Sequence, residues 1–474
     1  MRYFAVLESL DDERDIPQHV YLDCIAEPTF KIMLQAGGIR QVTAEMADDY
    51  MGAVLQVARA EIEPQLLARI NAQPGRLWLQ LTVSDERYED GANIPASFVS
   101  LAPTAALEVP PLYISPPTPA SGEIQSDAER VFKHPQLRTQ AFERFASWLQ
   151  ALVSRTEQRH VVAYHVGQGN CNAIVNQFEH PVLFFDLGWP IQTNIAGAPS
   201  PTPKLFDIQA FDEPAPVILS HWDWDHWAYA LESWSYDRNQ KAARATWKAR
   251  ALERPWLVPA PDRAMKLGPS HYLLIMKLFQ QRYMGERALH YWPKQKDRLF
   301  AVHLTIIKCR TRKKDISYRN NSGLAMIVRI DDGWDRGLVL LPGDSEFDSM
   351  NLGDIPPELT RRLVGMVASH HGGKLNVFSI PQTKAPNARL VISTGKNGYG
   401  HPNNRMLDNY GLQGWKDQCR TNDSGIGHVG ATLVQPENFD KPRCRCRRII
   451  KAGMSSNSSE GSIDSSALPA DFCI

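Results

Sequence analysis

The sequence predicts an α/β protein in which a smaller α+β region precedes a larger layered domain. One observation is a series of short apolar runs between residues 161 and 392, most of them bounded by turn residues or by His and Asp. Another is that helical stretches separate these runs, which together predict a layered αβ domain of about 280 residues. The expected strands are 161–166, 173–175, 182–185, 217–219, 304–307, 324–330, 338–341, 364–368 and 390–392.

The first 155 residues predict a separate α+β accessory domain. Apolar and alternating patterns predict strands at 3–7 and 76–83, and apolar spacing predicts a helix over 43–73. Dense prolines predict an extended connector or covering loop over 95–122. A long helix is expected over 127–157.

Three segments follow from these patterns. They are an accessory domain over 1–155, the layered domain over 156–435, and a basic and then Ser-rich flexible tail over 436–474.

Composition narrows the class of protein. Among 474 residues, Lys plus Arg and Asp plus Glu are both 52, so the net charge favours no particular partner. No apolar run approaches the roughly 20 residues of a membrane-spanning helix, and acidic residues come too early for a secretion signal. The seven cysteines lack CxxC spacing. We therefore expect a cytoplasmic protein with no membrane association, no disulfide framework and no four-thiolate zinc site.

The stretch SHWDWDHW, residues 220–227, crowds two His and two Asp residues into six positions. The apolar run before it predicts a buried strand, so these residues would form the loop at its carboxyl end. A loop can gather His221, Asp223, Asp225 and His226 around a common point, whereas alternate side chains of a strand diverge. Imidazole nitrogens and carboxylate oxygens are common ligands of divalent metals. The alternative is a Trp-rich turn with solvated polar side chains.

Further ligand-type residues recur at the ends of other expected strands. Asp186 and Asp344 each follow an apolar run, the paired His370 and His371 precede two glycines, and His401 lies between Gly400 and Pro402. A single such residue is more often a hydrogen-bonded loop residue than a metal ligand. The repetition across one domain favours a metal centre.

The order D…HxDxDH…GD…HHG…HP, preceded by Val166-Gly167-Gln168-Gly169, resembles the metallo-β-lactamase fold. The nearest resemblance is to the nuclease-type domain of the ComEC DNA-uptake proteins and their stand-alone relatives, over about residues 160–435. This resemblance implies a four-layer αββα sandwich with a metal centre at one edge and hydrolysis of phosphodiester bonds.

The resemblance also implies roles for individual residues. Asp186 would orient the metal ligands without itself binding the metal. His370 or His371 would be the metal ligand that comes late in the sequence. We assign His370 to the metal and His371, with His401, to proton donation to the leaving group. Asp225 would bind metal and accept the proton of the water, and Lys374 could stabilise a phosphate. The expected metal ligands are His221, Asp223, Asp225, His226, Asp344 and His370.

This chain departs from the family pattern at several positions. His165 and Asn170 stand where acids are usual beside the glycines, and bulkier residues replace glycines after His226. No motif between residues 227 and 343 clearly supplies the extra histidine of many members; His290 and His303 are the candidates. The expected centre therefore holds one or two ions, with the Asp225/His226 half the stronger. Because Asp223 adds a carboxylate, Mn²⁺ is favoured over its rival Zn²⁺.

Two features favour nucleic acid as the substrate. The basic runs 308–314 and 443–448 could neutralise phosphates, and Trp222, Trp224 and Trp227 could stack on bases. The alternatives are a solvated charged surface and tryptophans that merely pack around the ligands. The leading prediction is a nuclease acting on DNA, or also on RNA. The others are a hydrolase of small phosphoesters or esters, and a binding module whose residues 1–155 dock a partner in a multi-protein system such as defence against foreign DNA.

Overall fold

A computed structural model describes most of the chain. The described residues are 1–8, 18–88, 93–103, 109–137, 139–155, 160–176, 180–191, 205–206, 213–311, 317–332, 335–352, 362–395, 400–422 and 429–430. The predicted tail over 436–474, with the basic run 443–448, lies outside these residues.

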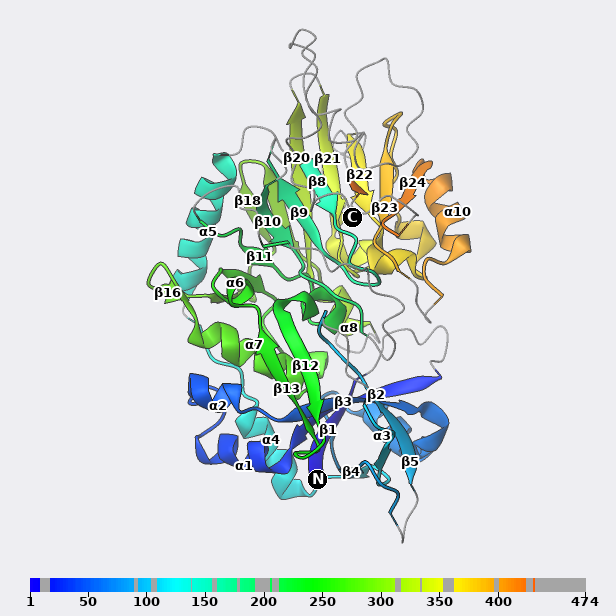
Figure 1. The fold of residues 1–474 in the computed structure, drawn as a ribbon. Helices are drawn as coiled ribbons and strands as arrows, with labels where there is room; N and C mark the ends of the chain where they lie inside the picture. Colours follow the sequence, from blue (N-terminus) through cyan, green and yellow to red (C-terminus); the bar gives the residue numbers. More distant parts are fainter. Residues whose placement is uncertain are drawn as a thin grey trace, which may run out of the picture.

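The N-terminal region contains a closed antiparallel barrel (Figure 1). Its strands follow the order β3-β2-β1-β4-β6-β5, and the ring closes because β5 also pairs with β3. The barrel strands are β1 Arg2–Glu8, β2 His19–Ala26, β3 Gly52–Ala58, β4 Trp78–Ser84, β5 Ile94–Phe98 and β6 Leu112–Ile114, with β7 Thr118–Pro119 paired to β4. Every residue of β1 after Arg2 is buried, because the strand packs on both faces.

Helices surround this barrel. They are α1 Glu27–Gln35, α2 Ala44–Asp48, α3 Pro64–Ala72 and α4 Gly122–Val131, with the short 3₁₀ turn η1 Arg59–Glu61. Helices α1 and α4 lie beside each other (Figure 1). The mixed α/β class is confirmed, whereas closure of the N-terminal strands into a barrel was not predicted.

Three local predictions in this region were wrong. The helix over 43–73 is interrupted by β3, whose β-branched residues pair with β2, and Pro64 starts a new helix. The connector over 95–122 instead supplies β5, β6 and β7. The long helix over 127–157 is two helices, α4 and α5 (Thr139–Ser154), and Pro135 lies in the break, where it lacks an N–H and disfavours helix before it.

Two seven-stranded sheets form the larger part of the molecule (Figure 1). One follows the order β17-β14-β11-β10-β9-β8-β25, and its strands are β8 His160–Ala163, β9 Asn172–Val175, β10 Pro181–Phe185, β11 Val217–Ile218, β14 Trp256–Val258, β17 Leu289–Tyr291 and β25 Val429–Gly430. The other follows β18-β19-β20-β21-β22-β23-β24, and its strands are β18 Arg298–Ala301, β19 Leu304–Lys308, β20 Leu324–Asp332, β21 Asp335–Leu341, β22 Leu363–Val367, β23 Arg389–Ile392 and β24 Asp417–Arg420. All nine strands expected between residues 161 and 392 are present.

The two sheets share one apolar core. Leu183, Phe185 and Ile218 from the first sheet are buried in the same cluster as Met326 and Val339 from the second. Helix α5 adds its apolar face to this core, and α10 (Asn404–Leu412) packs on the other face of the second sheet. The remaining α-helices in the described part of the chain are α6 Ala249–Leu252, α7 Pro269–Gln280 and α8 Tyr318–Asn321. A small hairpin joins β15 Arg282–Tyr283 to β16 Glu286–Arg287.

The predicted boundary near residue 155 does not separate two packing units. The hairpin of β12 (Leu231–Asp237) and β13 (Ala242–Trp247) leaves the larger part and extends the N-terminal sheet, because β13 pairs with β3 (Figure 1). One apolar cluster runs from the barrel into helix α7 and the outer face of the first seven-stranded sheet. The barrel therefore packs directly on the part of the chain that carries the candidate site.

Among the described helices, none combines the length and the apolar character that crossing a membrane requires.

Candidate metal centre

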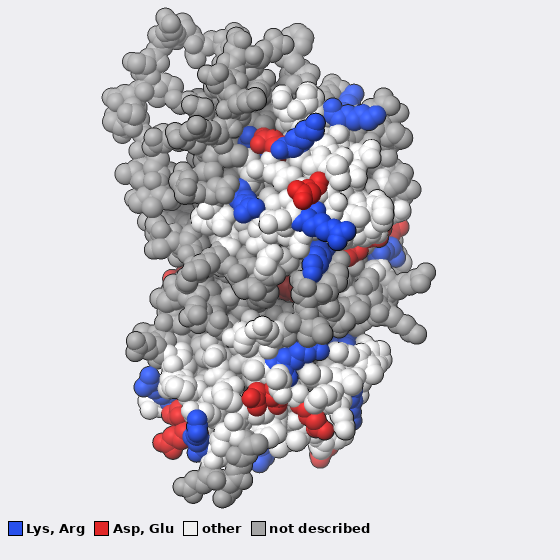
Figure 2. All heavy atoms as spheres, turned by 90° about the vertical axis from the view of Figure 1, so that its right-hand side faces the viewer, with Lys and Arg blue, Asp and Glu red and all other residues white. Residues whose placement is uncertain are grey.

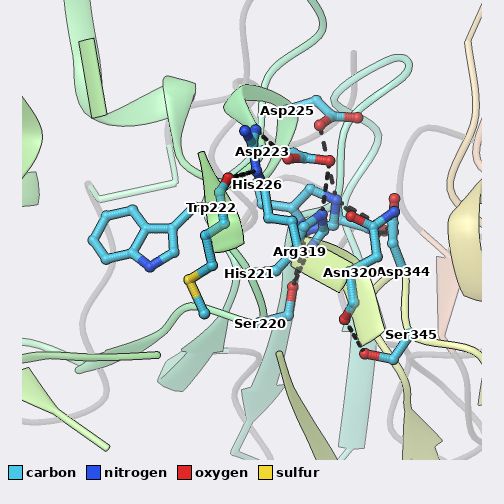
Figure 3. A network of polar contacts seen from close by, with 12 residues as sticks. Ser220, His221, Trp222, Asp223, Asp225, His226, Arg319, Asn320, Asp344 and Ser345 are labelled. Atoms are coloured by element: carbon cyan, nitrogen blue, oxygen red, sulfur yellow. Dashed lines mark hydrogen bonds and ion pairs between the residues drawn. The ribbon is translucent and has the colours of Figure 1, made fainter. Parts of the chain in front are cut away.

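The ligand-type residues meet at the carboxyl ends of neighbouring strands. Asp186 follows β10, and the loop 219–227 follows β11, which runs parallel to β10. Asp344 follows β21, and the two histidines follow β22, which runs parallel to β21. Parallel strands present their carboxyl ends at one edge of a sheet, so loops far apart in the chain come together there (Figure 3).

Backbone hydrogen bonds fasten the HxDxDH loop to its neighbours. The carbonyl of Asp225 accepts from the N–H of Asn170 at 2.9 Å, and the carbonyl of Asn170 accepts from the N–H of Gly188 at 2.7 Å. A Cβ at Gly188 would lie 1.8 Å from the Asp225 carbonyl oxygen, so this close approach requires glycine. The 3₁₀ turn η3 Trp224–His226 then directs Asp225 and His226 toward the site.

Left-handed backbone marks several of the site positions. Asp186, His370 and His371 have φ of 68°, 51° and 53°, and Gly343, just before Asp344, has φ of 60°. This conformation is uncommon for residues other than glycine and costs of order 1 kcal/mol or more at Asp186, His370 and His371. The surrounding contacts therefore hold these side chains in place against a local backbone preference.

His226 is the most completely buried member of the group. Its Nδ1–H donates to Asp186 Oδ2 at 2.9 Å, and Ser220 Oγ also donates to that oxygen at 2.8 Å. This bond fixes the ring so that Nε2 faces Asp344 Oδ1 at 3.2 Å. Asp225 Oδ1 lies 3.9 Å from the same nitrogen.

His371 repeats this arrangement from the other side. Its Nδ1–H donates to the carbonyl of Ser393 at 2.8 Å, and its Nε2 lies 3.1 Å from Asp225 Oδ2. Asp344 Oδ2 is 4.0 Å from that nitrogen. Each of the two imidazoles thus faces both carboxylates, at 3.1 to 4.0 Å.

The imidazole Nε2 atoms and carboxylate oxygens that face one another favour a positive charge between them. In a neutral ring whose Nδ1 carries the proton, Nε2 bears a lone pair, and here His226 and His371 direct it at carboxylates. Asn170 Nδ2 donates to Asp344 Oδ1 at 3.0 Å, but its buried Oδ1 has no hydrogen-bond partner among the described residues. These donors suit a divalent cation, and two groups are compact enough to hold one: His221, His226 and Asp344, and Asp225, His226 and His371.

Without such a cation, protons must balance the carboxylates. Burial opposes protonation of His226 and His371, but Asp344 and Asp225 outweigh it, so the pKa of both imidazoles is raised. Burial likewise acts to raise the pKa of Asp344, yet His226 and His371 hold that pKa well below its usual value. The electrostatics therefore favour an ionised Asp344, which attracts positive charge.

The other half of the motif is arranged differently. His221 Nε2 lies 3.2 Å from Asp223 Oδ2, whereas Asp223 Oδ1 accepts from Arg319 Nη1 at 2.9 Å (Figure 3). Burial would raise the pKa of Asp223, but His221 and Arg319 lower it. Asp223 is thus already paired with a guanidinium on helix α8.

The paired histidines are placed differently from the expectation that His370 lies at the metal. His371 lies among the ligand-type side chains, whereas the ring of His370 lies 5.2 Å from that of His401. The two residues share the left-handed turn η8 Ser369–Gly372, so adjacent side chains leave it in different directions. His401 lies against Gly373, where a Cβ would approach its ring to 2.6 Å, and Lys374 is half-buried on the next segment.

Neither candidate for an additional histidine ligand belongs to the ligand groups found among the described residues. His290 is buried against Phe145 of α5, with ring centroids 4.8 Å apart, and burial lowers its pKa to about 4. His303 ends the turn between β18 and β19, and its carbonyl accepts from the N–H of Arg329.

The tryptophans expected to stack on bases are buried. Trp222, Trp224 and Trp227 are at most 3% exposed, and their indole N–H groups donate to Pro259, Ser270 and Trp222, respectively. They therefore pack around the loop, as expected from the alternative interpretation that these tryptophans do not stack on bases.

Both basic side chains in the described part of the run 308–314 already have partners. Lys308 donates to the carbonyl of Ser322, and burial lowers its pKa to about 8. Arg310 is paired with Asp297, and residues 312–314 lie outside the described residues. On the face in Figure 2, described Lys and Arg side chains are scattered with acidic ones among them.

Sequence reasoning missed four residues that shape the site: Asn170, Ser220, Arg319 and Ser393. Asn170 was noted only as a departure from the family pattern, and Ser220 immediately precedes the motif, so position alone could have marked both. Arg319 and Ser393 carry no local signal, because only the tertiary fold brings them to the site.

A second group of acids and imidazole lies at the junction with the barrel. Glu8, Asp23 and His271 are all buried, with ligand atoms within 4.8 Å of one another. His271 Nδ1 is 3.5 Å from both Glu8 Oε1 and Asp23 Oδ2, and its ring stacks on Trp224. Through Trp224, this group therefore contacts the HxDxDH loop.

Sequence comparison gives no relative to guide interpretation: no protein-family model and no curated protein matches this chain.

Proposed function

We propose that this protein is a metal-dependent hydrolase of phosphodiester bonds, acting as a nuclease on DNA or RNA. One observation carries the proposal: Nε2 atoms of His226 and His371 and carboxylates of Asp225 and Asp344 converge from separate loops. A structural ion pair would need only two such groups. Four such groups, three of them oriented by a further hydrogen bond, suit a divalent cation.

We also propose that the larger part of the chain has the metallo-β-lactamase fold. The shared core of two seven-stranded sheets, with helices on outer faces, is compatible with an αββα sandwich. The order of the ligand-type motifs along the chain supports the same relationship. Fold alone does not determine the reaction, so the function rests on the site.

The burial of the ligands indicates the side from which a substrate would approach. The side chain of Asp225 is 19% exposed, whereas those of His226, His371 and Asp344 are at most 4% exposed. A bound divalent ion supplies Lewis acidity, which makes coordinated water a better nucleophile and offsets charge on a phosphoryl oxygen. Asp225, the exposed acid, is placed to accept a proton from such a water. His401 and His370 form a second imidazole pair from which a leaving group could take a proton.

The donor set bears on the identity of the ion. Two carboxylates and two imidazoles, with no thiolate, suit Mn²⁺, and Zn²⁺ is the rival because imidazole is one of its preferred ligands. We propose Mn²⁺ as the activating ion.

A second candidate is a hydrolase of small phosphoesters. Burial of Trp222, Trp224 and Lys308 favours it, because these residues were the main support for a nucleic-acid surface. A third proposal, that residues 1–155 dock a protein partner, is compatible with a barrel that packs on the site but has no specific observation in its favour.

Metal analysis combined with a substrate panel tests these proposals. Purified protein is assayed by mass spectrometry for bound metal, and with Mn²⁺ or Zn²⁺ against single- and double-stranded DNA, RNA and a small phosphodiester. We expect wild-type protein to bind metal and cleave nucleic acid, and Asp344→Asn to lose both properties. Asp348→Asn is the matched control, since this exposed acid four residues away bonds only Asn376 among the contacts described.

The outcomes separate the candidates. Cleavage of the small diester with nucleic acid intact favours the second candidate. Absence of bound metal, with no hydrolysis under either ion, would overturn the proposed function.

A further inference from the structure

We propose that Arg319, held by Glu8 of the N-terminal barrel, takes the place of a second metal ion and makes the centre mononuclear. The inference rests on the proposed metal site and specifies how many ions it holds. It concerns the His221/Asp223 half of the motif.

Every side of the Arg319 guanidinium is bonded within the protein. Nη1 donates to Asp223 Oδ1 at 2.9 Å, Nη2 donates to Glu8 Oε2 at 2.7 Å, and Nε donates to the carbonyl of Met265 at 3.0 Å. Arg319 is 7% exposed and Glu8 is 3% exposed. A buried guanidinium with three acceptors in fixed positions is a permanent positive charge beside the motif (Figure 3).

This charge would compete with a second ion for Asp223. An ion on Asp223 Oδ1 would compete with Nη1 for the same oxygen, and it would lie within a few ångströms of the guanidinium. Repulsion between a divalent ion and a buried cation at that separation lowers affinity by more than about a hundredfold. The second position is therefore already filled by positive charge.

The ligand supply points the same way. Among the described residues, Asp225 and His371 form one ligand group with His226, whereas His221 forms a group only with His226 and Asp344, both of which also face the first half, and Asp223 belongs to none. His290, a candidate for a further ligand, is packed against α5 instead. The Asp225/His226 half of the motif therefore has enough ligands for one ion. The His221/Asp223 half has to share ligands with it, and its own carboxylate is paired with Arg319.

Glu8 explains why this arrangement depends on the barrel. A buried guanidinium facing only Asp223 would lack a second countercharge, particularly once a metal ion competes for the neighbouring acids. Glu8 lies at the end of β1, so the barrel supplies the charge that keeps Arg319 in position. Glu8 is in this sense a positioning residue for the metal centre.

Metal stoichiometry tests the inference without relying on activity. Equilibrium dialysis against Mn²⁺ gives ions per chain, and electron paramagnetic resonance distinguishes an isolated Mn²⁺ from a bridged pair. We expect one ion for wild type and two for the double variant Glu8→Gln/Arg319→Gln. The double change removes both charges of the Arg319–Glu8 pair together, so Glu8 is not left as an unpaired buried carboxylate, and Asp223 keeps His221 as its neighbour.

Two single variants serve as controls for the double variant. Arg319→Lys keeps the positive charge and should stay at one ion, so it separates charge from shape. Arg389→Gln removes another buried arginine paired with an aspartate, Asp417, outside the ligand groups, and it should also bind one ion.

The number of bound ions decides the inference. Two ions in wild type would overturn it while leaving the proposed function intact, because Arg319 would then only orient Asp223 as a ligand. One ion in the folded double variant would also overturn it. No ion in wild type would overturn the inference together with the proposed function.

Discussion

Two buried groups of acids and imidazoles lie close together in this molecule, yet their chemistry differs. The candidate metal centre consists of two overlapping groups that share His226, one with Asp225 and His371 and one with His221 and Asp344. The barrel junction combines Glu8, Asp23 and His271. Both satisfy the same simple criterion, ligand atoms within reach of a single ion. The two groups differ in whether N–H and O–H groups of the protein donate hydrogen bonds to their carboxylates.

At the barrel junction, the carboxylates already accept hydrogen bonds. Asp23 Oδ2 accepts from both the N–H and the hydroxyl of Ser270, at 3.0 and 2.6 Å, and Glu8 accepts from Gly268 N–H and from Arg319. Gly268 and Ser270 begin helix α7, so these acids satisfy free N–H groups at a helix N-terminus. We therefore interpret this group as a structural junction.

At the metal centre, few donor hydrogens reach the carboxylates. Asp344 accepts one bond from Asn170, and otherwise Asp344 and Asp225 face imidazole nitrogens. The lesson is that residue type and proximity do not define a metal site. The direction of lone pairs and N–H groups separates a cation site from a set of hydrogen-bonded acids.

The largest expected effect comes from removing one imidazole of each group. His371→Ala should lower hydrolytic activity by about a thousandfold, equivalent to about 4 kcal/mol, because it removes a metal ligand. His271→Ala should instead lower the free energy of unfolding by about 2 kcal/mol, because it leaves a cavity behind Trp224. Steady-state kinetics and urea denaturation, both with and without a chelator, measure the two effects.

The chelator supplies the control for this pair. It should destabilise wild type and His271→Ala by the same amount, since both bind the ion, and leave His371→Ala almost unchanged. Equal losses of activity in the two variants would show that the two groups act as one site and would contradict the comparison.

A smaller effect, on metal affinity, is expected from replacing the acids that lie beside the Nδ1 atoms of the imidazoles. Asp186→Asn removes the charge that orients His226 through Nδ1, and we expect metal affinity to fall by about 10- to 100-fold. Asp23→Asn, a matched change beside His271, should leave metal affinity within about twofold of wild type. Competition titration with a chromogenic chelator measures both, and a comparable loss in Asp23→Asn would contradict the distinction.

The sequence predicted strands better than helices, for a physical reason. Buried parallel strands such as β10 and β11 appear as short apolar runs followed by ligand-type residues, so both the elements and their functional ends were recognisable. The helix predicted over 43–73 failed because apolar spacing there also fits β3, and only pairing with β2 decides between them. Barrel closure through β5 involves residues whose prolines suggested a connector.

The site was predictable as a set of residues more than as an arrangement. Most ligand-type side chains of the motif do converge, but the choice between His370 and His371 depended on two successive left-handed residues. The role of Arg319 depends on a junction between segments more than 300 residues apart in sequence, so no local pattern could reveal it. Burial of Trp222 and Trp224 likewise follows from packing against the barrel side.

The smallest expected effect is the pH dependence that the junction contributes to stability. Burial raises the pKa of Asp23 to about 7, despite hydrogen bonds from Ser270, and burial lowers the pKa of His271 to about 4. Folded Asp23 holds a proton that the unfolded carboxyl releases, so its contribution favours folding at low pH and is lost as pH rises through 7. His271 has the opposite sign, because its contribution is lost as pH falls from about 6.5 to about 4.

These contributions oppose each other between about pH 4 and 6.5, so wild type should have little pH dependence from this pair. Asp23→Asn leaves only the His271 contribution. Relative to wild type, its free energy of unfolding should then fall by up to about 1.4 kcal/mol per pH unit as pH drops through that window. Urea denaturation at several pH values, with chelator present, measures the slope. A curve parallel to that of wild type would mean that Asp23 is ionised in the folded protein, as an acid fully satisfied by the helix N-terminus would be.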